Sequence, residues 1–209
     1  MHFLATLGLI FAATTALAAP AGELEARQSL SSSRNDVKSR KCAPVTVIFA
    51  RGTTELGNVG SIAGPPFFTA IDKAVGSIAV QGVDYPADVV GFLAGGSSDG
   101  AKNMAQYAQT AITNCPDTKL VMSGYSQGAQ VARKAVNQLG AAQSSIGAIV
   151  LFGDPNNGDS WGALQAKTKT FCNVGDLICA GTSVILPAHL TYGSDATAAA
   201  NFVKQMVGA

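Results

Sequence analysis

One serine and one histidine are the residues of this chain best suited to chemistry. Ser126 lies at the centre of the pentapeptide 124–128, Gly-Tyr-Ser-Gln-Gly, and His189 is the only histidine besides His2. A serine hydroxyl becomes nucleophilic when a neighbouring base takes its proton, and histidine is suited to do so near neutral pH. Because His2 lies in a segment that we expect to be removed, His189 is the one candidate base for Ser126.

The glycines of the pentapeptide have a steric reason to flank the serine. A sharp turn from a strand into a helix strains the serine backbone, and side chains two residues before or after it would collide. The apolar run 119–123 predicts a buried strand before the turn. Apolar residues at helical spacing predict a helix over 127–139, which Gly140 ends. The pattern therefore favours a nucleophile over an incidental serine in a tight glycine turn.

The composition is typical of a compact globular protein and gives no indication of a nucleic-acid-binding one. The 209 residues are 47% hydrophobic and 13% charged, with a formal net charge of +1. This length allows one domain with a substantial core or two small ones. No lysine and arginine cluster is interleaved with aromatic residues, so there is no electrostatic argument for nucleic-acid binding. Nothing in the sequence indicates an oligomer, and we expect a monomer.

The first 41 residues differ from the rest. A short apolar stretch, 3–17, followed by small residues at Ala16-Leu17-Ala18, predicts a secretory signal peptide over 1–18; a buried N-terminal helix is the alternative. No later segment has the roughly 18 apolar residues of a membrane span, so we expect no stable membrane insertion. Residues 19–41 are serine-rich and lack an apolar period, which predicts a pro-segment or disordered arm before a single domain over 42–209. We expect a secreted, extracellular protein.

The four cysteines are expected to form disulfide bonds, because secretion exposes them to an oxidising environment. Four cysteines allow three pairings. We favour Cys172–Cys179, which are close in sequence, and Cys42–Cys115, which would join the start of the domain to the helix before the Ser126 strand. With no second histidine beyond the leader and no short Cys-x-x-Cys spacing, we expect no metal site and no cofactor.

Strand and helix patterns alternate along the domain. Strands are expected at 45–50, 78–83, 119–123, 146–152 and, more weakly, 167–172. Helices are expected from Pro65 or Pro66 to 75, from the loop 95–99 to about 114, over 127–139 and over 195–207. This alternation predicts an α/β fold, a three-layer α/β/α sandwich around a central, mostly parallel sheet.

A catalytic histidine needs a carboxylate that orients it and stabilises its charged form. In the chain order of α/β-hydrolases the acid lies between serine and histidine, where Asp154, Asp159 and Asp176 occur. We favour Asp176, because it follows the last strand before His189 and a Cys172–Cys179 disulfide would fix its loop. Asp154, directly after the strand that follows the nucleophile's, is the main alternative.

The oxyanion of an acyl transfer needs two or more hydrogen-bond donors. The backbone N–H of Gln127, directly after the nucleophile, is one by the geometry of the elbow. The loop 51–55, Arg-Gly-Thr-Thr-Glu, follows the first strand and is placed to supply another. Thr53 offers both its N–H and its hydroxyl.

These motifs together resemble the fungal cutinases, secreted serine esterases with a minimal α/β-hydrolase fold. The matching stretches are 50–55, 124–128, 172–179 and 189–193, and they span nearly all of 42–209. The resemblance implies a triad of Ser126, Asp176 and His189, an oxyanion hole at Thr53 and Gln127, and the two disulfides favoured above. The family often has serine where this chain has Thr53, whose extra methyl group crowds the site.

The resemblance also implies apolar substrate contacts on two loops, here Val89 and the run Val184, Ile185 and Leu186. From the sequence alone that run is equally explained by core packing. Larger relatives of the fold carry a lid in a long insertion, whereas residues 152–167 leave little room for one. We therefore expect a lidless domain with an exposed active site.

The expected activity is hydrolysis of carboxylic esters, with cutin polyester and soluble short-to-medium acyl esters as substrates. Ser126 would attack the ester carbonyl and His189 would take its proton, so activity should fall as the pH drops through roughly 6–7. One alternative keeps the chemistry and changes the substrate: an acetylxylan or other carbohydrate esterase. The other is a secreted surface-binding protein without catalysis, which an intact serine, histidine and acid set argues against.

Overall fold

The computed structural model describes residues 32–209, and the expected signal peptide (1–18) and the first part of the expected arm (19–31) lie outside them. Five strands form one sheet in the order β2-β1-β3-β4-β5, and every neighbouring pair is parallel. The strands are β1 (Val45–Ala50), β2 (Ile78–Gly82), β3 (Lys119–Tyr125), β4 (Ile146–Phe152) and β5 (Thr168–Phe171). All five lie where the sequence predicts them.

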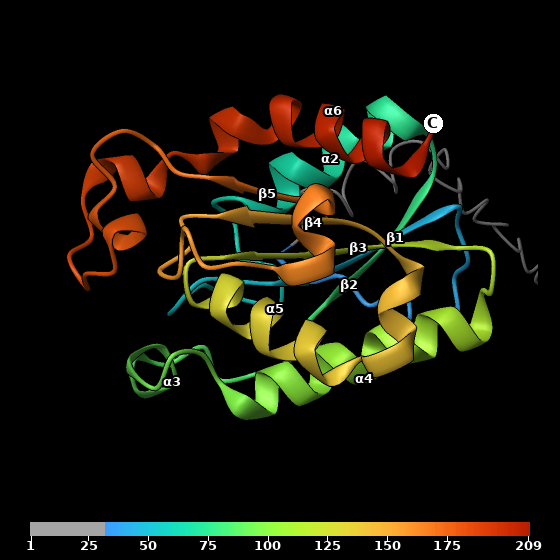
Figure 1. Ribbon diagram of the computed structural model, residues 1–209, viewed down its shortest axis with the longest axis horizontal. Helices are drawn as coiled ribbons and strands as arrows, with labels where there is room; N and C mark the ends of the chain where they lie inside the picture. The colour runs from blue at the N-terminus through green and yellow to red at the C-terminus, as the bar shows by residue number, and fades with distance from the viewer. Residues whose placement is uncertain (1–31) are drawn as a thin grey trace, which may run out of the picture.

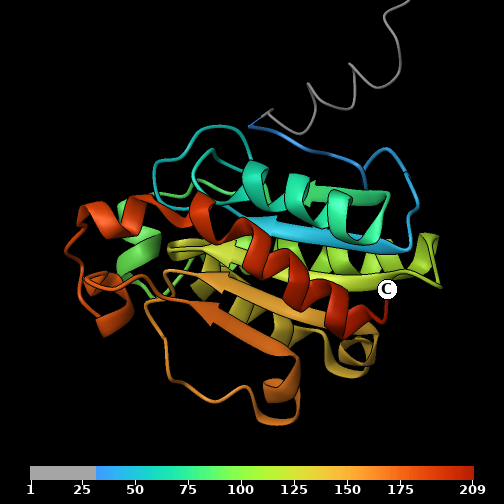
Figure 2. The same ribbon diagram turned by 90° about the horizontal axis from the view of Figure 1, so that it is seen from above.

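Helices cover both faces of this sheet, which confirms the predicted three-layer sandwich (Figure 1). On one face lie α2 (Gly64–Val75) and α6 (Ala196–Val207), which run side by side across the strands (Figure 2). On the other face lie α4 (Ser98–Asn114) and α5 (Gln127–Gln138). The short helix α3 (Val89–Leu93) was not predicted, because five residues are too few to show a helical period.

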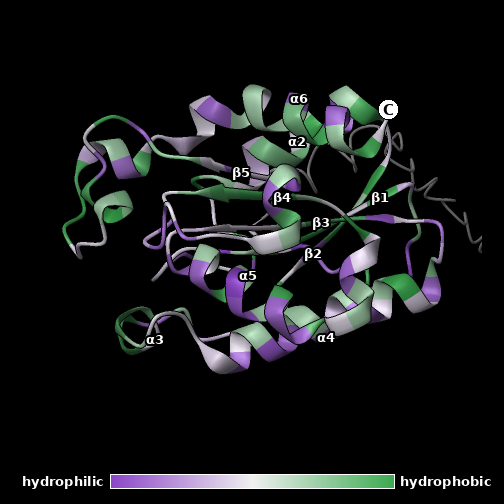
Figure 3. Ribbon diagram, in the orientation of Figure 1, coloured by the Kyte–Doolittle hydropathy of each residue, from purple (hydrophilic) through white to green (hydrophobic). Residues whose placement is uncertain are grey.

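The three central strands, β1, β3 and β4, are buried along almost all of their length, which is why they are mostly apolar, whereas the edge strand β5 is only partly buried and has the sequence Thr-Lys-Thr-Phe. Successive strand side chains point to opposite faces, so Val47 and Phe49 of β1 enter the core under α2 and α6. Ile48 and Ala50 of the same strand enter the core under α4 and α5. Apolar colour is accordingly concentrated on the strands and on the inner sides of the helices (Figure 3).

Residues 32–41 are packed against the domain, and in this part of the chain the expected disordered arm is not observed. Val37 is buried, and the guanidinium of Arg34 pairs with the carboxylate of Asp36 at 2.8 Å in a buried position. Asn35 forms an isolated bridge with Gln81 of the edge strand β2. The segment therefore covers an edge that would otherwise expose unpaired backbone groups. With one large apolar residue in ten, it shows no period that a sequence pattern could reveal.

Both favoured disulfides form. Cys42 and Cys115 join the chain before β1 to the end of α4, with a Cα–Cα distance of 5.6 Å. Cys172 and Cys179 close a loop after β5, with a Cα–Cα distance of 6.1 Å. Between β4 and β5 lies a single short 3-10 helix (Gly162–Lys167), so no lid subdomain is present there. Within residues 32–209 no helix is long and apolar enough to cross a membrane.

Candidate active site

Ser126 lies at the elbow between β3 and α5, in a conformation that non-glycine residues rarely adopt. Its φ and ψ angles are 57° and −121°. A Cβ on Gly124 would lie 2.1 Å from the carbonyl oxygen of Gly128, and a Cβ on Gly128 would lie 1.9 Å from that of Ala50. The two glycines are therefore required by close backbone packing, as expected for a nucleophile elbow.

The structure brings the three predicted catalytic side chains into one hydrogen-bonded chain. His189 Nε2 lies 2.9 Å from Ser126 Oγ, and His189 Nδ1 lies 2.8 Å from Asp176 Oδ2. His189 is 1% exposed, and Ser126 and Asp176 are each 6% exposed. With a carboxylate at Nδ1, the imidazole is held with Nε2 directed at the hydroxyl, which is the orientation a general base needs.

Asp176 is held as an acceptor by several donors. Its Oδ1 accepts the backbone N–H of Ile178 at 3.0 Å, and its Oδ2 accepts the hydroxyl of Tyr192 at 2.5 Å in addition to His189. Burial alone would raise the pKa of Asp176, but the hydrogen bonds from His189 and Tyr192 outweigh it and hold the pKa below its ordinary value. The carboxylate thus stays ionised beside the imidazole, inside the loop that Cys172–Cys179 closes.

The histidine loop is fixed by residues that the sequence patterns did not single out. The hydroxyl of Tyr125, from the pentapeptide itself, donates to the backbone carbonyl of His189 at 2.8 Å. Its ring lies 5.0 Å from the imidazole, between centroids. A Cβ on Gly153 would lie 2.7 Å from His189 Cε1, so a larger residue after β4 would displace the imidazole. Nothing in a single sequence distinguishes this glycine from any other turn glycine.

The two other candidate acids are bound elsewhere. Asp154 is fully buried, and it accepts from the guanidinium of Arg133 at 3.2 Å and from the backbone N–H of Asn156 at 2.9 Å. Burial raises the pKa of Asp154 above its ordinary value, although these partners act in the opposite direction. Asp159 lies exposed in a turn. Neither carboxylate has a hydrogen bond to His189, whereas Asp176 does.

Thr53 and Gln127 lie together at the start of α5. The side-chain amide of Gln127 donates to Thr53 Oγ1 at 2.9 Å and to the backbone carbonyl of Asp88 at 2.6 Å. Since Thr53 Oγ1 already accepts a hydrogen bond, its own hydrogen remains available to a third group. The carboxylate of Glu55 fixes the same loop by accepting the backbone N–H of Gly52 at 2.8 Å. The side chain of Gln127 was missed by the sequence analysis, which assigned it only a backbone donor.

Apolar side chains surround this end of the sheet. The four predicted contacts, Val89, Val184, Ile185 and Leu186, are all exposed, so the run 184–186 is not core packing. Leu56, Val90, Leu93, Val174, Leu177 and Leu190 are exposed as well. These ten residues form what we call the apolar rim, and all of them lie on connections that follow the carboxyl end of β1, β2 or β5. Figure 1 shows α3 and the chain between β5 and α6 beyond the same end of the sheet.

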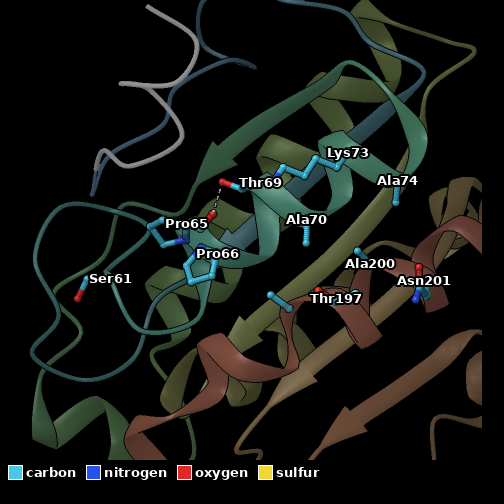
Figure 4. A pocket seen from close by; sticks show the side chains of 11 residues that line it. Ser61, Pro65, Pro66, Thr69, Ala70, Lys73, Ala74, Thr197, Ala200 and Asn201 are labelled. Atoms are coloured by element: carbon cyan, nitrogen blue, oxygen red, sulfur yellow. Dashed lines mark hydrogen bonds between the residues drawn. The ribbon is translucent and has the colours of Figure 1, made fainter. Parts of the chain in front are cut away.

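A hollow of about 690 Å³ lies between α2 and α6 (Figure 4). Its walls are mostly small or apolar, including Pro65, Pro66, Ala70 and Ala200, and Lys73 is the one charged side chain among the residues that line it. None of the predicted site residues lines this hollow, and it contains no pairing of a nucleophile with a base. Within residues 32–209, no group of three or more His, Cys, Asp or Glu side chains could hold a metal ion.

Known proteins match both the sequence and the structure. Residues 41–207 match the family model for cutinases. A cutinase from Botryotinia fuckeliana is 50% identical over 196 residues, covering 92% of this chain and 91% of the relative. A cutinase from Coprinopsis cinerea is 47% identical over 210 residues, covering 99% of this chain and 100% of the relative.

Solved structures agree with this assignment. A Trichoderma reesei cutinase in complex with a phosphonate inhibitor has a TM-score of 0.79 and 44% identity, covering 89% of this chain and 84% of that one. An acetylxylan esterase has a TM-score of 0.58 at 23% identity, covering 80% of this chain and 100% of that one, and so shares the fold. The chain therefore belongs to the cutinase family, which consists of carboxylic ester hydrolases.

Proposed function

We propose that this protein hydrolyses carboxylic esters, with cutin polyester as its substrate class, through an acyl-enzyme on Ser126. The observation that carries the proposal is the hydrogen-bonded chain from Ser126 through His189 to Asp176, both links of which are shorter than 3 Å. It is supported by the apolar rim, whose side chains are exposed on the loops that follow the carboxyl ends of the strands, the end of the sheet at which Ser126 lies.

The reaction runs in two symmetrical halves. Ser126 Oγ attacks the ester carbonyl carbon while His189 Nε2 takes its proton, and the carboxylate of Asp176 stabilises the imidazolium that forms. The tetrahedral oxyanion is held by the backbone N–H of Gln127 and by the N–H and hydroxyl of Thr53. His189 then gives its proton to the departing alcohol as the acyl-enzyme forms. Water repeats the attack, and the acid leaves with the Ser126 hydroxyl restored.

The apolar rim supports an acyl chain or a polyester surface over a sugar as the partner. Ten large apolar side chains are exposed at the connections that bear the site, and an exposed apolar patch of this kind marks a binding surface. A carbohydrate esterase shares the fold, and its substrate would call for polar side chains at these positions. We propose soluble short-to-medium acyl esters as further substrates, because the exposed side chains of the apolar rim offer contacts to an acyl chain.

We also propose that the protein is secreted as a monomer, with residues 1–18 as a signal peptide, 19–31 as a pro-segment and the folded domain as the catalytic unit. Two disulfides join all four cysteines, and such pairs persist in oxidising compartments. The apolar stretch 3–17 of the sequence supports the same conclusion. Mass spectrometry of the N-terminus of the secreted protein tests both boundaries.

The proposal is tested with Ser126→Ala and a matched control, Ser123→Ala. Ser123 is a buried serine on β3, the strand that leads to Ser126, and its hydroxyl has no hydrogen-bond partner, so its loss should leave activity and folding intact. Ser126→Ala should lose several orders of magnitude in kcat/KM on p-nitrophenyl butyrate without unfolding. An organophosphate should modify Ser126 in the wild type.

Two results would redirect the assignment. Failure of the organophosphate to label Ser126 in folded protein would support a binding protein without catalysis. Release of acetate from xylan faster than hydrolysis of butyrate esters and cutin would support a carbohydrate esterase instead.

A further inference from the structure

Tyr192 is a fully buried residue beside the proposed triad that the mechanism above does not use. It lies three residues after His189, at the start of a 3-10 helix (Tyr192–Asp195), and is 0% exposed. Its hydroxyl lies 2.5 Å from Asp176 Oδ2, the same oxygen that lies 2.8 Å from His189 Nδ1. One oxygen of the Asp176 carboxylate thus accepts hydrogen bonds from both the phenol and the imidazole.

The direction of the phenol hydrogen bond is fixed by a third group. The backbone N–H of Asn173 donates to the hydroxyl oxygen of Tyr192 at 3.1 Å. The phenol hydrogen is therefore left for Asp176, which as a carboxylate can only accept. Burial first, and the hydrogen bond to Asp176 second, raise the pKa of Tyr192, so the phenol keeps its proton throughout the working pH range. Tyr192 is accordingly a permanent donor to the acid.

Two donors on one oxygen have opposite effects on the imidazole. By holding Oδ2 in place, the phenol keeps the carboxylate within reach of His189 Nδ1. By donating a hydrogen bond to the same oxygen, it also reduces the negative charge that is available to stabilise the imidazolium. The Tyr192 hydroxyl thus affects both the position and the effective negative charge of Asp176 Oδ2.

We propose that Tyr192 is a positioning residue that sets the lower pH limit of the enzyme, by weakening the stabilisation that Asp176 Oδ2 gives to the imidazolium of His189. The inference rests on the proposed function of Ser126 and His189. It predicts the direction in which the acidic limb of the pH profile moves when the phenol hydroxyl is removed. Without that hydroxyl the imidazolium of His189 is more stable, so His189 becomes protonated, and the enzyme inactive, at a higher pH.

The other titratable groups around this site make their hydrogen bonds to groups other than the carboxylate of Asp176. Tyr125 packs on the other side of His189, and its hydroxyl donates to the His189 backbone carbonyl rather than to the acid. Asp195 faces the side chain of Asn173, and Glu55 lies on the loop after β1, where it accepts backbone N–H groups. Among these groups, only Tyr192 donates to Asp176 Oδ2 besides His189.

This difference supplies a matched control. Tyr192→Phe and Tyr125→Phe each delete one buried phenol hydroxyl from a ring that lies against His189, at centroid distances of 6.0 and 5.0 Å. Both changes should loosen the histidine and lower kcat. Only Tyr192→Phe changes the hydrogen bonding of the acid, so only Tyr192→Phe should move the pH profile.

The experiment measures kcat/KM on a soluble ester from pH 5 to 9 for the wild type and both variants, because this profile reports groups of the free enzyme. We expect the midpoint of the acidic limb to rise by about half a pH unit or more in Tyr192→Phe and to stay in place in Tyr125→Phe. A limb that stays in place in Tyr192→Phe, or moves to lower pH, overturns the proposal. So does an equal upward shift in Tyr125→Phe, since the effect would then come from loosening alone.

A second substitution keeps the test valid if Tyr192→Phe does not fold. Placing 3-fluorotyrosine at position 192 retains the ring and the hydroxyl but makes the phenol a stronger donor, so the acidic limb should move to lower pH. An unchanged limb in the folded fluorinated protein contradicts the proposal.

The inference can fail separately from the proposed function. If Ser126→Ala keeps its esterase activity, the proposed function is wrong. The link between Tyr192 and His189 is still measured in that case, by NMR titration of the His189 ring with and without Tyr192→Phe in a Ser126→Ala background. An unchanged titration midpoint overturns the inference whatever the activity shows.

Discussion

Removing the two disulfides one at a time should show that one mainly stabilises the fold and that the other mainly maintains the geometry of the active site. The Cys42–Cys115 bond joins residues 73 apart, and the Cys172–Cys179 bond joins residues 7 apart. The entropy that a cross-link removes from the unfolded chain grows with the logarithm of the loop it closes. For these loops it corresponds to about 4 kcal/mol and about 2.5 kcal/mol of stability, respectively.

For activity we expect the opposite order, with the larger loss of kcat when the Cys172–Cys179 bond is removed. Cys42 precedes β1 and Cys115 precedes β3, so this bond lies at the amino ends of the strands, away from Ser126. The Cys172–Cys179 loop contains Asp176, the acid that orients His189. Loosening that loop should cost about 10- to 100-fold in kcat, because small misplacements of catalytic groups are expensive.

The assay combines thermal unfolding, followed by circular dichroism, with hydrolysis of a soluble ester at 25 °C. Replacing Cys42 and Cys115 by alanine should lower the Tm by about 10–15 °C, and replacing Cys172 and Cys179 should lower it by about 5–10 °C. At 25 °C the first variant should retain its kcat and the second should not. A larger Tm loss from the short loop, or an equal loss of kcat in both folded variants, would refute this division of roles.

Substitutions at three further positions test single contacts in and near the site. Gly153→Ala places a Cβ 2.7 Å from His189 Cε1 at a φ of 57°, and should lower kcat by about 100-fold while costing about 1–2 kcal/mol in urea unfolding. Thr53→Val removes the hydroxyl that we propose as an oxyanion donor and should lower kcat by about 100-fold, whereas Thr53→Ser should keep most of it in the same ester assay. Arg133→Leu leaves the carboxylate of Asp154 buried without its 3.2 Å partner, and should cost about 3 kcal/mol without moving the acidic limb of the pH profile.

Each of these expectations has a contradicting result. Full activity in Gly153→Ala would mean that the imidazole moves without cost. Equal kcat values for the valine and serine variants of Thr53 would remove its hydroxyl from the oxyanion hole. A shifted pH limb in Arg133→Leu would link Asp154 to His189 and reopen the choice of acid.

Local sequence determined the five strands, the four longer helices and the elbow at Ser126. A parallel strand buried on both faces is mostly apolar, so β1, β3 and β4 are visible as apolar runs that only Thr46, Lys119, Ser123 and single glycines interrupt. The glycines on either side of Ser126 are equally visible, because the collision they avoid is with backbone a few residues away or in the adjoining strand. These constraints do not depend on which side chains surround the strands and the elbow, so they can be recognised in a single sequence.

Contacts between distant segments were decided only by the tertiary structure. The sequence favoured Asp176 over Asp154, but its hydrogen bond to His189 is seen only in the structure. The same holds for the amide of Gln127 on Thr53 and for the hydroxyl of Tyr192 on Asp176, because each bond joins segments that meet only in the folded domain. Exposure of the run 184–186 is of the same kind, since an apolar residue packs or protrudes according to what the rest of the chain places over it. Hydrogen bonding and burial of this kind depend on distances in space, which the spacing of residues along the chain does not fix.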